Sequence, residues 1–190
     1  MVTGLESVTL GVEDLDAALA ALRDVPGLRQ ESDAQASVGL LAAWHYPIHA
    51  DVRLIELSQE GRAKGRVRLA RFDPDVGRPP EEFQPAAVDA QEGRHFYREG
   101  LGLDEGLGLD ESLDAALSAD LRARLARIGA VSLLTLSCTD LDALEARLGE
   151  LEAEIVTRPT HVVLGSGTPT RILLARGPNQ ELLEFVERAE

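Results

Sequence analysis

Two glutamates in similar apolar runs are the residues of this sequence best suited to chemistry. Glu56 lies in VRLIEL and Glu184 in ELLEFV, so each carboxylate is flanked by residues that favour a buried strand. A carboxylate that faces an interior needs an arginine, a metal ion, a proton or a cationic ligand to offset its burial. If both face inward, a raised or shared pKa predicts that one serves as a general acid or base. If they face outward from an edge strand, they do no chemistry.

The histidines and the cysteine offer less. Cys138 is the only cysteine, and it lies in an apolar run without a CxxC pattern, which predicts a buried, unreactive thiol. One cysteine excludes an internal disulfide and a zinc site built on several thiolates. We interpret the isolated histidines as surface or capping residues, with a rearranged metal site as the alternative; they are His45, His49, His95 and His161.

Trp44 and Tyr46 are two of the few aromatic residues in a chain that is 4% aromatic. Alternate residues of a strand point to the same side. A strand over 37–46 would therefore place both rings on one face, where they could line a pocket for a planar ligand. Packing within the core is the alternative interpretation.

The charge and composition exclude several classes of partner. The chain has 190 residues, 44% of them hydrophobic, and a net charge of −14. Nucleic acids and anionic membranes are bound through clustered lysine and arginine, so we expect neither partner. The N-terminus lacks a basic leader, no apolar run reaches the roughly 20 residues of a membrane helix, and one cysteine fits a reducing compartment. We expect a cytoplasmic protein whose partner is a neutral or cationic small molecule, or another protein.

Both ends of the chain are predicted to form a βαβββ module. In the first, residues 1–60, we expect a helix over 14–23 and strands over 5–12, 28–33, 37–46 and 52–58. In the second, residues 130–190, we expect a helix opened by residues 139–142 and strand segments over 131–138, 154–157, 161–164, 170–175 and 181–186. The two modules are also similar in sequence: VTLGVEDLDA, from Val8, matches LTLSCTDLDA, from Leu134. At their far ends VRLIELSQE matches QELLEFVER, which pairs Glu56 with Glu184.

Residues 61–129 fall outside both modules. They contain a strand-like run over 67–72, a Pro-rich stretch, and a predicted helix near 111–128 whose leucines recur every four residues. We interpret this segment as an insertion, with a degenerate third module as the alternative.

The order of elements, the duplication and two segments resemble the vicinal oxygen chelate superfamily, which includes glyoxalase I, bleomycin-resistance proteins and extradiol dioxygenases. The two segments are SVTLGVEDLD, from Ser7, and GPNQELLEFVE, from Gly177, where the family often has aspartate. HFYREGLGL, from His95, also resembles the stretch that ends the first helix of a family module. The resemblance implies an α+β fold in which paired βαβββ modules form cupped, mostly antiparallel half-barrels around a ligand cavity.

The resemblance also implies where a metal ion would bind. Metal-using members take ligands from the first and last strands of each module, at positions that we match to Ser7, Leu133, Glu56 and Glu184. The first two are often histidine in the family, so this sequence keeps two carboxylates and has lost both imidazoles. We therefore expect either no cofactor or a weakly bound divalent metal such as Mg²⁺ or Mn²⁺ on Glu56 and Glu184. Ser7 and Leu133 become candidate ligand-binding residues, together with Trp44 and Tyr46.

Three functions are compatible with these observations. The first is a glyoxalase- or bleomycin-resistance-like protein that binds a small organic ligand in the sheet cavity without a histidine-based metal site, where acidic charge would attract a cation. The second is a metal-assisted lyase, isomerase or dioxygenase of the same superfamily, with Glu56 and Glu184 as ligands or base. The third is a non-catalytic structural or regulatory protein with a vestigial cavity. Half-barrels of this superfamily often pair across subunits, so a homodimer is an alternative to completing the barrel within one chain.

Overall fold

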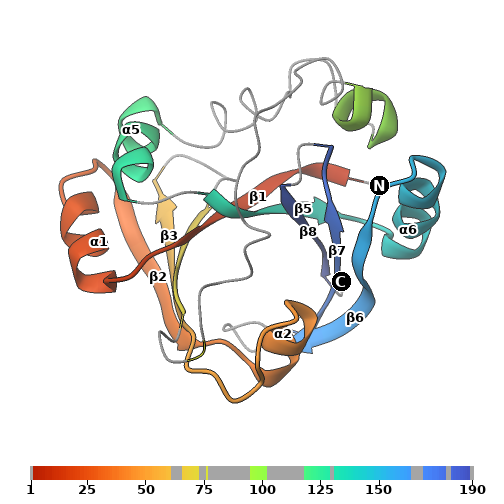
Figure 1. Cartoon of the computed structure of the whole chain (residues 1–190). Helices are drawn as coiled ribbons and strands as arrows, with labels where there is room; N and C mark the ends of the chain where they lie inside the picture. Colours follow the sequence, from red (N-terminus) through yellow and green to blue (C-terminus); the bar gives the residue numbers. More distant parts are fainter. Residues whose placement is uncertain are drawn as a thin grey trace.

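A computed structural model of the chain shows one eight-stranded sheet with helices packed on it (Figure 1). It describes residues 2–60, 66–72, 76, 95–101, 118–128, 131–163, 169–178 and 181–188. The strands are β1 (Val2–Gly11), β2 (Leu28–Gln35), β3 (Arg53–Gln59), β4 (Arg66–Arg71), β5 (Val131–Cys138), β6 (Ile155–Val163), β7 (Pro169–Arg176) and β8 (Leu182–Arg188). The helices are α1 (Leu15–Leu22), α2 (Val38–Ala43), α5 (Ala119–Ile128) and α6 (Leu141–Glu150), with a π-helical turn η2 (His95–Gly100).

The strand order β2-β3-β4-β1-β5-β8-β7-β6 divides the sheet into two equivalent halves. β1 and β5 pair antiparallel at the centre. On its other side, each of them pairs in parallel with the last strand of its own half, β1 with β4 and β5 with β8. All other neighbours are antiparallel. The predicted α+β fold of paired βαβββ modules is confirmed, with α2 as an addition in the first half.

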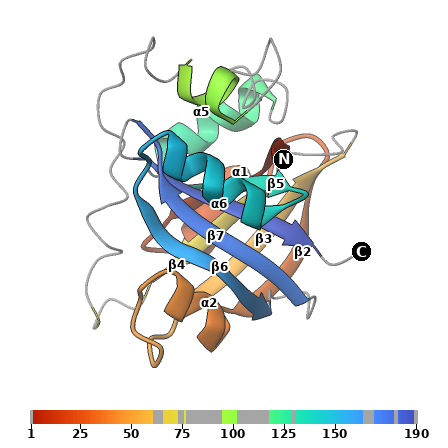
Figure 2. The same cartoon turned by 90° about the vertical axis from the view of Figure 1, so that its right-hand side faces the viewer.

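The sheet is curved and open, and its strands surround a concave interior (Figure 1). Figure 2 shows the same sheet from the side, with α6 lying over β7 and β8 on the outside. α2 lies against the edge strand β6, where the Thr157 hydroxyl donates to the carbonyl of Ala43 at 2.7 Å. Because α2 follows directly after the other edge strand, β2, this helix brings the two ends of the sheet close together.

The convex face is covered by two helices that begin in the same way. The Asp14 carboxylate accepts hydrogen bonds from the amides of Asp16 and Ala17 at the start of α1, and Asp140 accepts one from Ala143 at the start of α6. Such N-caps satisfy amides that have no partner within the helix. The leucines predicted to face the sheet are buried there: Leu15 and Leu22 on α1, and Leu141, Leu144 and Leu148 on α6.

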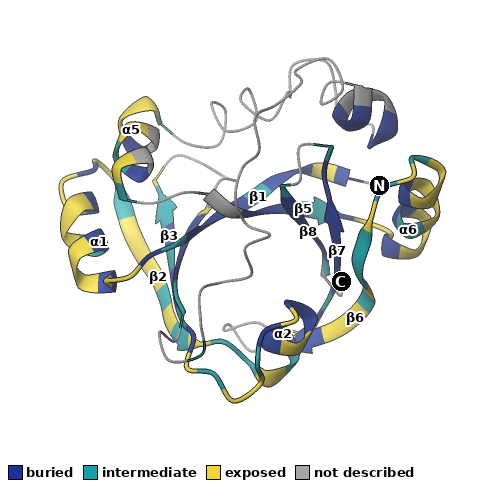
Figure 3. Ribbon diagram, viewed as in Figure 1, coloured by how far each residue is buried: buried dark blue, intermediate teal, exposed yellow. Residues whose placement is uncertain are grey.

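Alternation along the strands separates the convex face from the concave one. On β1, Val8 and Leu10 belong to the hydrophobic core under the helices. Their neighbours Ser7 and Thr9 therefore face the concave side, and they are buried as well. Figure 3 shows that most of β1 is buried. A second apolar cluster lines the concave side with side chains from α2, β3, β4, β5 and β7; it includes Leu41, Leu54, Ala70, Leu133 and Leu174.

Three sequence-based expectations about the elements are wrong. The strand expected over 37–46 is helix α2, because Ser37 caps it by accepting a hydrogen bond from the amide of Leu40. The two short strands expected within 154–164 form one strand, β6. The fourth strand of the first half is β4, not the run that contains Glu56, because β4 pairs with both β1 and β3. We therefore propose that the first module runs to Arg71 rather than to residue 60.

Two pieces of the middle segment pack on the convex side. In α5, Leu121 and Leu125 are buried in the convex core. This helix covers the end of the one expected near 111–128, while residues 111–117 lie outside the described part of the chain. In η2, Phe96 and Tyr97 are buried in the same core, and the Tyr97 hydroxyl donates to the Glu181 carboxylate. In the described residues, no helix is long and apolar enough to cross a membrane.

Candidate ligand-binding site on the concave face

A buried arginine on β4 forms the centre of a charged cluster on the concave face. The guanidinium of Arg68 contacts Glu56 of β3, with 3.2 Å between Nη2 and Oε1, and Glu184 of β8, with 3.3 Å between Nη1 and Oε1. β4 and β8 are separated by β1 and β5, which is about 14 Å at the usual spacing of strands. The two side chains meet because the sheet curves and both project into its interior. Both predicted carboxylates thus lie on the concave side and share one partner.

Glu184 is held by three side chains from three different elements. It has no exposed surface. Its Oε1 accepts hydrogen bonds from Arg68 and from the Thr135 hydroxyl at 3.0 Å, and its Oε2 accepts one from the indole Nε1 of Trp44 at 3.0 Å. A buried carboxylate is tolerated only when its lone pairs are satisfied in this way. These hydrogen bonds hold the Glu184 carboxylate in one orientation.

Glu56 is held less completely. Its side chain is 23% exposed, and its Oε2 has only a long contact of 3.5 Å with the hydroxyl of Ser32. The two carboxylates therefore differ, although their sequence contexts are similar. Glu56 is the one whose side chain is partly exposed.

Arg68 remains a cation in this environment. Burial alone would lower the pKa of Arg68, but the attraction and hydrogen bonds of Glu184 and Glu56 outweigh it, so the pKa is raised above its usual value. The cluster contains two carboxylates and one guanidinium, so the positive charge of Arg68 offsets the charge of one carboxylate.

Three buried polar atoms beside Arg68 have no hydrogen-bond partner among the described residues: Ser7 Oγ, Thr9 Oγ1 and Arg68 Nε. Thr9 lies in register with Arg68 in the parallel pairing of β1 and β4, and Ser7 lies two residues earlier on the same face. The residues are 4%, 1% and 4% exposed, in the order Ser7, Thr9 and Arg68. A fourth atom of this kind, Arg71 Nε, belongs to a side chain that is 41% exposed at the end of β4. Leaving a buried polar group without a hydrogen bond costs about 1–3 kcal/mol of stability. Three such groups together make this part of the face a candidate ligand-binding site.

The predicted aromatic residues flank the charged cluster, but not in the expected way. Trp44 and Tyr46 follow helix α2 and do not share a strand face. Both are buried in the concave apolar cluster and pack against Phe72, with ring centroids 6.4 Å and 5.3 Å from it, respectively. Phe72, just beyond β4, is a member of this group that sequence analysis missed. Binding of a ligand by Trp44 and Tyr46 stays a prediction.

Ser7 and Leu133 both lie at the centre of the concave face, on adjacent strands. Ser7 pairs with Thr135, and Leu133 pairs with Thr9, across the boundary between β1 and β5. Leu133 belongs to the concave apolar cluster, whereas Ser7 belongs to the polar group beside Arg68. The structure thus brings every predicted site residue to one face.

Sequence analysis missed Arg68 because two neighbouring strands have nearly the same pattern. VRLIEL, which contains Glu56, and VRLARF, which contains Arg68, both begin with VRL. We matched Glu184 to the first of them, but the residue in its position is Arg68. The pairings show this: Arg68 lies beside Thr9 in one half, and Glu184 lies beside Thr135 in the other. The presence of two such runs in succession was the signal that either of them could be the last strand of the first module.

The residues at the positions implied by the resemblance do not fit a divalent metal ion. With the observed register, the first-strand positions are Ser7 and Leu133 and the last-strand positions are Arg68 and Glu184. Only Glu184 is an anionic donor, and the guanidinium between it and Glu56 would repel a metal cation. In the described ranges of the chain, no group of three or more His, Cys, Asp or Glu side chains could hold a metal ion.

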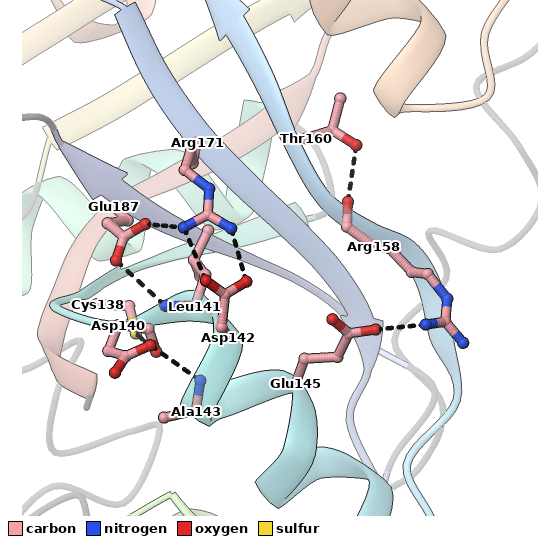
Figure 4. A network of polar contacts seen from close by, with 10 residues as sticks. All are labelled: Cys138, Asp140, Leu141, Asp142, Ala143, Glu145, Arg158, Thr160, Arg171 and Glu187. Atoms are coloured by element: carbon pink, nitrogen blue, oxygen red, sulfur yellow. Dashed lines mark hydrogen bonds and ion pairs between the residues drawn. The ribbon is translucent and has the colours of Figure 1, made fainter.

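A second polar network lies on the convex side and ties α6 to the sheet (Figure 4). Arg171 of β7 binds Asp142 of α6 at 2.7 Å and Glu187 of β8 at 2.8 Å, and Glu187 in turn accepts a hydrogen bond from the first amide of the helix, that of Leu141. The hydrogen bond from Arg171 lowers the pKa of Asp142. Cys138 is buried beside this network, and burial raises the pKa of its thiol, in line with the predicted unreactive cysteine. These contacts fix the helix and leave the concave face as the candidate site.

Comparison with known proteins bears on the fold. No protein-family model matches the chain, and no curated protein matches it in sequence. Among solved structures, a methylmalonyl-CoA epimerase from Mycobacterium tuberculosis matches with a TM-score of 0.53 and 20% identity over 100% of this chain and 90% of the other. A second methylmalonyl-CoA epimerase matches with a TM-score of 0.51 and 14% identity, over 100% and 98%. A hypothetical protein from Bacillus halodurans C-125 matches with a TM-score of 0.50 and 10% identity, over 98% and 94%.

Methylmalonyl-CoA epimerases are members of the vicinal oxygen chelate superfamily. The two halves of the sheet, the parallel pairing within each half and these full-length matches agree with one another. The chain therefore has the vicinal oxygen chelate fold, and the resemblance seen in its sequence is confirmed at the level of the fold.

Proposed function

We propose that this protein binds a small organic molecule on the concave face of its sheet, around Arg68, and that it does so without a histidine-bound metal ion. The observation that carries this proposal is the set of three buried, unpartnered polar atoms next to a buried ion-pair cluster. A face whose only role was packing would fill such positions with apolar side chains, as Leu54, Leu133 and Leu174 do nearby.

The surroundings of the cluster suit an organic ligand. Apolar side chains from several strands and the aromatic group around Phe72 lie next to a small number of polar groups, which is the usual composition of a small-molecule site. Two structures of the same fold are named for methylmalonyl-CoA, a thioester that also carries a carboxylate. Acyl thioesters are therefore the first compounds to test.

Trp44 makes the proposal directly testable. It is the only tryptophan of the chain, and its indole nitrogen binds Glu184. Its fluorescence therefore reports on the cluster alone. We would titrate the protein with methylmalonyl-CoA, coenzyme A, propionate and choline, with and without EDTA, and follow Trp44 emission and calorimetric heat. We expect at least one of the organic compounds to bind, with an affinity that EDTA does not change.

A substitution that adds bulk beside Arg68 tests whether the ligand binds there. Ser7→Leu gives the first half the side-chain type that the second half has at Leu133, and it adds bulk beside Arg68. It is expected to weaken binding more than tenfold, while the cost of overpacking, about 1–3 kcal/mol, leaves a typical domain folded. Thr160→Leu, at an exposed position of β6, is the control and should bind as the unmodified protein does. Absence of binding by every compound, or equal binding by Ser7→Leu, would overturn the proposal.

The partly exposed, less completely held carboxylate of Glu56 favours one second candidate, an isomerase that moves a proton. Glu56 lies beside the cation of Arg68, and its Oε2 has only a long contact with a hydroxyl among the described residues. By contrast, both oxygens of Glu184 accept hydrogen bonds. Glu56 is then the base, and Glu184 positions Arg68. Incubation of methylmalonyl-CoA with the protein in D₂O would reveal this activity as deuterium at the carbon between the two carbonyl groups. Glu56→Gln should abolish the exchange, and exchange at the uncatalysed rate with the unmodified protein would exclude the candidate.

A further inference from the structure

The three unpartnered atoms on the concave face belong to neighbouring residues of two paired strands. In the parallel pairing of β1 and β4, Thr9 lies opposite Arg68, and Ser7 lies opposite Arg66. Ser7, Thr9 and Arg68 therefore share one face. Each Nη atom of Arg68 donates one hydrogen bond to a carboxylate, whereas its Nε has no partner among the described residues.

The chemistry of these atoms calls for a hydrogen-bond acceptor. Arginine Nε can only donate, and both hydroxyls are able to donate. A cationic group would bring a positive charge next to the donor Nε of the Arg68 guanidinium, so it does not suit this part of the face even though the chain carries a net charge of −14. A carboxylate does not suit it well either, because the two glutamates already outnumber the arginine. A neutral carbonyl oxygen supplies the acceptor without adding a charge.

We infer that Ser7 Oγ, Thr9 Oγ1 and Arg68 Nε form one subsite that receives the carbonyl oxygen of a neutral acyl group, such as a thioester or an ester. This inference rests on the proposed function and names the class of ligand. Glu56 and Glu184 hold the two Nη atoms, so they fix the orientation of the guanidinium and act as positioning residues. Donors aimed at a carbonyl oxygen from a buried site polarise the C=O bond more strongly than water does.

The second half of the sheet does not repeat this arrangement. Thr135 corresponds to Thr9, but its hydroxyl donates to Glu184 at 3.0 Å. Leu133 stands at the position that corresponds to Ser7, and Glu184 at the one that corresponds to Arg68. The chain therefore carries one subsite of this kind within its described residues, and binding should have a stoichiometry of one.

A matched pair of compounds tests the inference. S-propionyl-N-acetylcysteamine is a neutral thioester, and S-propyl-N-acetylcysteamine differs from it only in lacking the thioester oxygen. We expect the thioester to bind at least tenfold more tightly, which corresponds to one hydrogen bond at a buried site. With ¹³C at the thioester carbonyl, its infrared stretch should move to lower frequency on binding, because hydrogen bonds weaken the C=O bond. Propionate is included to distinguish a carboxylate ligand.

Variants that remove single donors complete the test. Thr9→Val and Ser7→Ala keep the shape of the face and should each weaken thioester binding about tenfold and reverse part of the infrared shift. Arg68→Lys keeps the charge but has no Nε donor, and it should do the same. Thr160→Val, which removes an exposed hydroxyl from β6, should change neither quantity.

The outcomes separate the inference from the proposed function. Equal binding of thioester and thioether, no infrared shift, or full binding by Thr9→Val would overturn the carbonyl subsite while leaving ligand binding on the concave face in place. Preference for propionate over the thioester would likewise overturn it, in favour of an anion site. If no compound of either panel changed Trp44 fluorescence or gave heat, the proposed function itself would fail.

Discussion

The two halves of the sheet have the same topology but differ in what they place on the concave face. On the convex face they are alike: each has a helix capped by an aspartate, Asp14 or Asp140, with leucines against the strands. On the concave face Arg68 stands in one half where Glu184 stands in the other, and the two form an ion pair across the centre. On the convex face each half packs its own helix, so similar side chains suit both halves. On the concave face side chains of the two halves meet, so they must complement one another. A duplicated fold thus acquires one asymmetric site per chain.

Breaking the ion pair between the halves should have the largest effect. Arg68→Met leaves Glu184 buried without its cation, which we expect to cost about 3–5 kcal/mol of unfolding free energy. Adding Glu184→Gln removes the uncompensated charge and should recover a large part of that loss. Urea unfolding of both single variants and the double variant measures the coupling. Additive losses would show that the two residues do not interact in the folded protein.

The two equivalent threonines should respond in opposite ways. Thr135→Val deprives Glu184 of a donor and is expected to destabilise the protein by about 1–3 kcal/mol. Thr9→Val removes a hydroxyl that has no hydrogen-bond partner in the described part of the chain, so stability should stay the same or rise by up to about 1 kcal/mol. Urea midpoints of the two variants, measured without ligand, compare them directly. Equal losses would mean that the Thr9 hydroxyl has a structural partner, and the subsite would then be wrong.

On the convex face, by contrast, the halves should behave alike. Asp14→Ala and Asp140→Ala each remove an N-cap and should each cost about 1 kcal/mol. Asp14→Asn and Asp140→Asn keep an acceptor and serve as controls with smaller losses. Thermal unfolding would detect both changes. A cap that mattered in one half alone would show that similarity of the two convex faces does not extend to their energetics.

The smallest expected effect is on acid stability. The pKa of Asp33 is lowered by the hydrogen bond from Arg53 in the first half, and that of Asp142 by Arg171 in the second. A carboxyl whose folded pKa is lowered stabilises the protein above its ordinary pKa of 3.8, and this contribution is lost as the pH falls through the folded value. Both pairs are exposed, so the effect is small and sensitive to salt. An NMR titration should show the pKa of Asp142 returning toward its ordinary value in Arg171→Gln and that of Asp33 in Arg53→Gln.

Local chemistry was enough to predict much of the fold. Aspartate caps followed by leucines at helical spacing predicted α1 and α6, and their repetition predicted two equivalent modules. The same logic failed at 37–46, where a strand is expected, because the Ser37 cap and the run of leucine and alanine form a short helix instead. The candidate carboxylates and aromatic residues came from the residue types in apolar runs, whereas Ser7 and Leu133 came from the family resemblance. All of them contribute to the concave side.

Periodicities and helix starts can be predicted from the chain alone, because they depend on neighbours a few residues apart, and the duplication can be predicted because both copies keep similar runs. The strand that closes the first half follows only from the folded structure. That choice depends on pairing between β1 and β4, which are far apart in the chain, and VRLIEL and VRLARF both have the apolar pattern of a strand. It replaced Glu56 with Arg68 opposite Glu184, and so turned a pair of carboxylates that could hold a metal ion into a buried ion pair. The curvature of the sheet then brought that arginine and glutamate into contact across two intervening strands.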